Sequence, residues 1–70
     1  MSEGDHLFEL ACEAGSPAEC IGKFNQQELV KLMNHVDHLI ARNGTSGGVP
    51  ALISGLCIIE AAERYKKIIL

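Results

Sequence analysis

The segment Val49–Ile59 constrains the fold more than any other part of the chain. It reads Val-Pro-Ala-Leu-Ile-Ser-Gly-Leu-Cys-Ile-Ile and has no charged residue. The pattern predicts the first half of a helix that is apolar on nearly every side. A helix in a globular domain usually buries one stripe, so a helix that is apolar all round needs cover on all sides. Since the chain has 70 residues, we expect part of this cover to come from a second copy or from another protein.

Size and composition predict one small helical domain over residues 1–70. The apolar fraction is 47% and the formal net charge is -3, which is typical of a globular chain. At this length the core lies near the lower limit for independent stability. Aromatic residues make up only 4% and Trp is absent, so the core must be aliphatic. These features favour an all-α fold.

Several classes of partner and location are disfavoured. The acidic balance argues against binding a nucleic-acid backbone, and the few aromatic residues leave no stacking platform for single strands. The chain has three cysteines, Cys12, Cys20 and Cys57. An odd number without paired spacing does not indicate a disulfide framework, so we expect reduced thiols in a cytoplasmic protein. The first six residues lack the order of a signal peptide, in which basic residues precede an apolar run. The apolar runs of the chain are too short to cross a membrane. We therefore expect a soluble protein without a membrane partner or a cofactor.

Three segments carry the signature of a helix start. Ser2–Asp5, Ser16–Glu19 and Asn25–Glu28 each place a capping side chain three residues before an acid. The acid can accept a hydrogen bond from the backbone N–H of the capping residue, and its charge suits the positive end of the helix. Pro17 falls at the first helical position, where its missing N–H costs little.

Apolar spacing places the helices that follow these starts. We expect a first helix over 3–14 that stops at Gly15, and a short one over 17–21 that ends at Gly22. Two long helices should cover 26–42 and 50–69. In the first long helix the apolar residues recur at steps of three and four: Leu29, Leu32, Met33, Val36, Leu39 and Ile40.

The short connector between the long helices predicts an antiparallel helical hairpin. A turn centred near Thr45 and Ser46 would pair residues that are all apolar. The pairs are Leu39 with Leu52, Val36 with Leu56, Leu32 with Ile59 and Leu29 with Ala62. This register leaves a strip of the last helix uncovered, which we predict to be a partner or dimer interface: Ile53, Ile58, Ala61, Tyr65 and Ile68. We expect a homodimer or higher oligomer that forms a helical bundle across a two-fold axis.

Two polar clusters offer alternatives to this interpretation. His35 and His38 are three residues apart, so both could bind one metal ion, with Cys57 near the level of His35 in the hairpin. The polar side of an amphipathic helix explains the same residues, and the four-ligand spacing of a structural zinc site is absent. Arg42, Thr45 and Ser46 precede the start of the last helix and could bind a small anion.

The sequence offers no convincing arrangement for catalysis. Small or apolar residues flank each Cys on at least one side, and buried Cys commonly acts as a small hydrophobe. Glu60 with Arg64 and Glu63 with Lys67 are four residues apart, which explains these carboxylates as helix ion pairs. A DNA-binding helix-turn-helix motif is disfavoured, because the last helix is apolar at its start, where contacts with bases would be made. We therefore expect the protein not to be an enzyme.

The expected function is interaction with another protein. The chain is typical of a small cytoplasmic adaptor, inhibitor or regulator, of the kind that phages and plasmids encode, acting through a helix face. The alternative is an oligomeric protein that binds or sequesters a small anionic ligand such as a nucleotide, with the site between subunits. The residues themselves indicate no known family.

Overall fold

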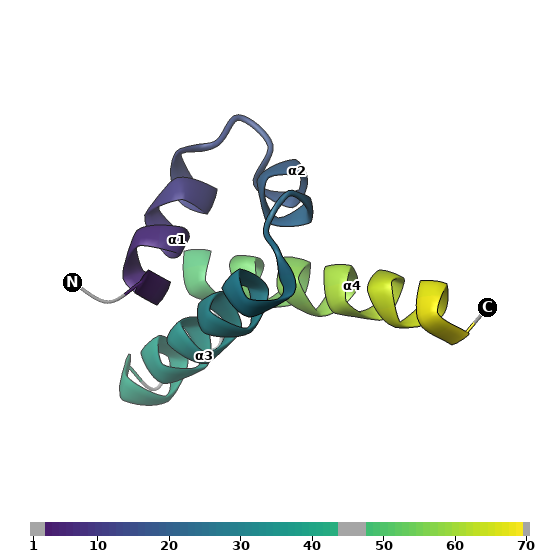
Figure 1. Ribbon diagram of the computed structural model, residues 1–70. Helices are drawn as coiled ribbons and strands as arrows, with labels where there is room; N and C mark the ends of the chain where they lie inside the picture. Colours follow the sequence, from purple (N-terminus) through teal and green to yellow (C-terminus); the bar gives the residue numbers. More distant parts are fainter. Residues whose placement is uncertain (1–2, 44–47, 70) are drawn as a thin grey trace.

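The computed structural model describes residues 3–43 and 48–69, and within them every regular element is a helix. The elements are α1 (Glu3–Glu13), α2 (Pro17–Gly22), α3 (Gln26–Asn43) and α4 (Val49–Ile69), as Figure 1 shows. The predicted all-α class is confirmed, and each predicted helix is present with its ends moved by one residue at most.

Two of the three predicted helix starts are visible as hydrogen bonds. At the start of α3, the Glu28 N–H donates to Asn25 Oδ1 at 2.8 Å, and the Asn25 N–H donates to Glu28 Oε1 at 2.9 Å. This reciprocal pair is a capping box. At the start of α2, the Glu19 N–H donates to Ser16 Oγ at 3.4 Å. The third start, at Ser2, lies outside the described residues.

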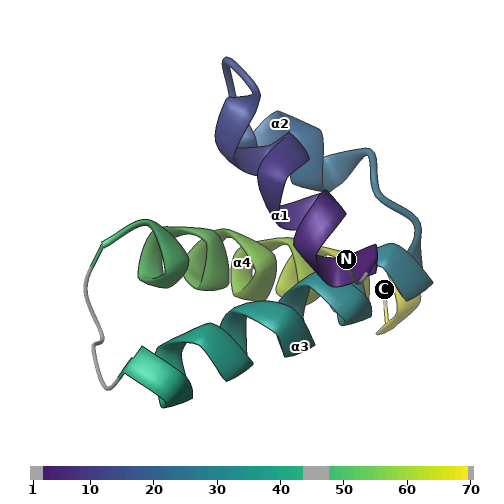
Figure 2. The ribbon, with the colours of Figure 1, turned by 90° about the vertical axis from the view of Figure 1, so that its left-hand side faces the viewer.

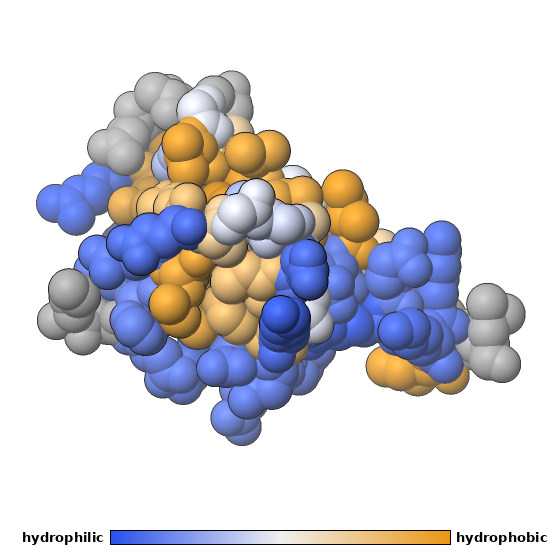
Figure 3. Space-filling view, turned by 90° about the horizontal axis from the view of Figure 1, so that it is seen from above, coloured by the Kyte–Doolittle hydropathy of each residue, from blue (hydrophilic) through white to orange (hydrophobic). Residues whose placement is uncertain are grey.

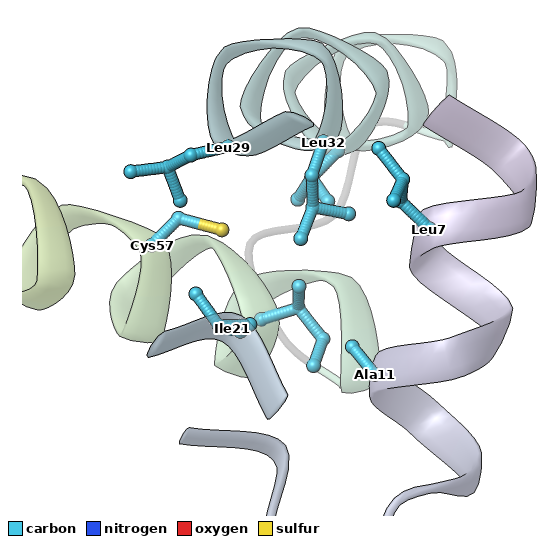
Figure 4. Close-up of a cluster of buried hydrophobic side chains, with 8 residues drawn as sticks. Leu7, Ala11, Ile21, Leu29, Leu32 and Cys57 are labelled. Atoms are coloured by element: carbon cyan, nitrogen blue, oxygen red, sulfur yellow. The ribbon is translucent and has the colours of Figure 1, made fainter. Parts of the chain in front are cut away.

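All four helices contribute to one buried apolar cluster, which Figure 4 shows in close-up. Each member has at most 2% of its surface exposed. The cluster contains no aromatic residue, in agreement with the aliphatic core expected from composition. Its members are Leu7 and Ala11 from α1, Ile21 from α2, Leu29, Leu32 and Val36 from α3, and Ile53 and Cys57 from α4.

The helices pack in two layers around this cluster. α1 packs mainly against α3, α2 packs against α4, and α3 contacts α4 (Figure 2). The N-terminal half of α4 lies within the body, whereas its C-terminal half extends beyond the other helices (Figure 1). The molecule is accordingly elongated, with extents of 38 × 21 × 21 Å.

A close approach between α1 and α3 depends on Gly4. A Cβ atom at this position would lie 2.7 Å from the Cβ of His35 and 2.9 Å from the carbonyl oxygen of Lys31. Only glycine fits such a contact without a shift of one helix. Two polar contacts flank it: the Lys31–Glu3 ion pair at 2.7 Å, and the approach of His35 Nε2 to Asp5 Oδ1 at 3.5 Å.

Most of the predicted docking face of α4 is wrong, although Leu56, one of its four residues, is partly buried against the core. Leu52 and Ile59 were expected to face α3, but they are 58% and 61% exposed, and Ala62 is exposed as well. The side chains that enter the core are Ile53 and Cys57. Adjacent helix positions differ by roughly 100° about the axis, so α4 is turned by about one residue from the predicted register.

The reason for this difference is α2. The register predicted from sequence paired α4 with α3 alone, whereas α4 lies against α2 and α1 as well. The edge that enters the cluster containing Ile21 is the one that carries Ile53 and Cys57. The α3 face was predicted correctly, since Leu29, Leu32 and Val36 are fully buried.

Adjacent truncations in α4 test this orientation. Ile53→Ala should lower the free energy of unfolding by about 2–5 kcal/mol, because it opens a cavity in the core. Leu52→Ala is the matched control and should change stability by no more than about 0.5 kcal/mol, because Leu52 is largely exposed. Urea unfolding followed by circular dichroism measures both. A larger loss for Leu52→Ala would support the register predicted from sequence.

Candidate interaction surface

Arg64 holds α4 against the connection between α2 and α3. Its Nε donates to Glu60 Oε2 at 2.8 Å, its Nη1 donates to Gln26 Oε1 at 3.2 Å, and its Nη2 donates to the carbonyl oxygen of Phe24. The side chains of Arg64 and Glu60 are only 22% and 25% exposed. The predicted Glu60–Arg64 pair is confirmed, and the contacts with α3 and Phe24 make it a link between helices.

The second predicted pair in α4 differs from the structure. Glu63 pairs with Lys66, with 3.9 Å between Oε1 and Nζ, rather than with Lys67. Both side chains are more than half exposed, so the pair contributes little to stability. The projecting end of α4 is therefore held to the body by Arg64 and not by its outer charges.

Replacing Arg64 tests this link. Arg64→Ala should lower the free energy of unfolding by about 1.5–3 kcal/mol, because hydrogen bonds made by a charged, largely buried donor are lost. Arg64→Lys should recover only part of this, since an ammonium cannot reproduce the planar fork of the guanidinium. Lys67→Ala is the control on the same helix and should be nearly neutral. Equal effects at positions 64 and 67 would contradict the role assigned to Arg64.

An apolar strip runs along the projecting half of α4. We use the name α4 strip for Ile58, Ala61, Tyr65 and Ile68, which recur at steps of three and four and so share one face. Ile58, Tyr65 and Ile68 are 58%, 64% and 81% exposed, whereas Ala61 is partly buried and packs against the core of its own chain. All four belong to the predicted interface. Ile53 was predicted with them, but it is 1% exposed inside the core and does not belong to this surface.

Because α4 is rotated about its axis relative to the predicted register, it also exposes apolar residues that the prediction paired with α3. Leu52 and Ile59 are each more than half exposed, and so is Val49, which the predicted register did not pair. They lie on the opposite flank of α4 from the α4 strip. Figure 3 shows the charged, hydrophilic surface of the projecting end, with hydrophobic atoms along its edge. No pattern in the sequence could separate Leu52 from Ile53, because the helix is apolar on both sides at that level.

The two histidines considered as metal ligands have different surroundings. The His35 ring lies 5.8 Å from the Phe8 ring, and its Nε2 is 3.5 Å from Asp5. His38 is exposed, and it lines an open depression between α1 and α3 together with His35. Cys57 is buried in the core. Within residues 3–43 and 48–69, no three His, Cys, Asp or Glu side chains are grouped to hold one metal ion.

Little of the candidate anion site falls within the described structure. Arg42 is exposed near the end of α3. Thr45 and Ser46 lie outside the described residues. An anion site at the start of α4 therefore stays a prediction from sequence.

The three cysteines are free thiols with different exposure: Cys12 is exposed, Cys20 is partly buried and Cys57 is buried. Burial raises the pKa of Cys57 to about 11, with a further contribution from the Asp37 carboxylate. The pKa of Cys12 is also raised, first by partial burial and then by the neighbouring Glu13. Reactive cysteines have lowered pKa values, because the thiolate is the nucleophile.

Cys57 should therefore resist alkylation in the folded protein. A rise in pKa of about 2 units lowers the thiolate fraction near neutral pH roughly a hundredfold, and burial slows the reaction further. Because the folded state favours the protonated thiol, stability should also fall as pH rises from about 9 towards about 11. Iodoacetamide labelling followed by peptide mass spectrometry measures the rate at each thiol, with Cys12 as the exposed reference. Comparable rates at both thiols would contradict the burial of Cys57.

Comparison of the chain with family models, curated proteins and solved structures gave no match. Among the helices described here, none combines the length and the apolar character that a membrane span requires.

Proposed function

We propose that this chain is a small cytoplasmic interaction protein, without enzymatic activity, that binds another protein surface through α4. In this proposal α3 and α4 form an antiparallel helical hairpin, and the preferred oligomeric state is a homodimer. The observation that carries the proposal is the α4 strip, with three large side chains more than half exposed on a helix end that projects from the body. An adaptor, inhibitor or regulator requires such a surface.

The exposed area supports this proposal. A folded monomer of 7.6 kDa has a surface of about 4300 Å² by the usual scaling with mass. This chain exposes 4741 Å², roughly a tenth more. Full burial of one large aliphatic side chain is worth about 1.5–3 kcal/mol, so covering Ile58 and Ile68 would contribute substantially to an association.

Tyr65 gives the surface an anchor. Its ring is 64% exposed, next to two exposed Ile side chains of the same face. Tyr is enriched in binding hot spots because its ring packs against apolar surface while its hydroxyl can hydrogen-bond at the rim. The raised pKa values of Cys12 and Cys57 further favour binding over nucleophilic catalysis.

Charge substitutions in the α4 strip test the proposal. Ile58→Glu and Tyr65→Glu should each weaken self-association at least about tenfold, because a carboxylate would have to be desolvated in the interface. The measurement is multi-angle light scattering over a concentration series, in which wild type should approach twice the 7.6 kDa chain mass.

Val30→Glu is the matched control. Val30 is 43% exposed on α3 and does not belong to the α4 strip, so this variant should associate like wild type. The same variants should be compared for retention of any protein partner captured from the source organism. If Ile58→Glu and Tyr65→Glu retain every association of wild type, α4 is not the binding surface and the proposed function is wrong.

A further inference from the structure

We draw no further inference here: the strongest candidate, the exposed apolar face on the projecting half of α4 that carries Ile58, Tyr65 and Ile68, belongs to the surface already described, and nothing in the structure shows what covers it.

Discussion

The burial of one narrow edge of α4 governs the architecture and the surface of this protein. Ile53 and Cys57 enter a core that α1, α2 and α3 also line. Because α4 is apolar on nearly every side, the choice of this edge decides which apolar residues remain outside. Arg64 secures the choice through hydrogen bonds to Glu60, Gln26 and the Phe24 carbonyl. α4 is thus held by the burial of Ile53 and Cys57 in the core and by the hydrogen bonds of Arg64 at the edge of the body.

The exposed strip is a consequence of this arrangement together with the small size of the chain. α4 has 21 residues, and the shorter helices α1 and α2 cover only its N-terminal half. The C-terminal half therefore keeps Tyr65 and Ile68 in solvent. Exposed apolar area of this kind favours association, because a partner removes it from water at little additional ordering of the helix.

The polar edge of α3 shows how packing accounts for residues that resemble a ligand set. His35 lies against Phe8 and pairs with Asp5, and Gly4 permits the close approach of α1 at this point. His38, one turn further along, remains in solvent. The spacing of three residues thus places one histidine in a helix–helix contact and the other on the surface. Their different surroundings follow from the position of α1, which crosses α3 beside the first histidine.

Local signals in the sequence were sufficient to predict where the helices lie and which face of α3 is buried. The capping residues at Ser16 and Asn25 located two helix starts, and the spacing of Leu29, Leu32 and Val36 located the buried face of α3, because these features act within a few residues. The orientation of α4 could not be obtained in this way. A helix apolar on all sides has no preferred face of its own, so contacts with Ile21 and the Arg64 links select it. Periodicity therefore defined the elements, while the cover supplied by α2 placed Ile53 inside and left Ile58, Tyr65 and Ile68 at the surface.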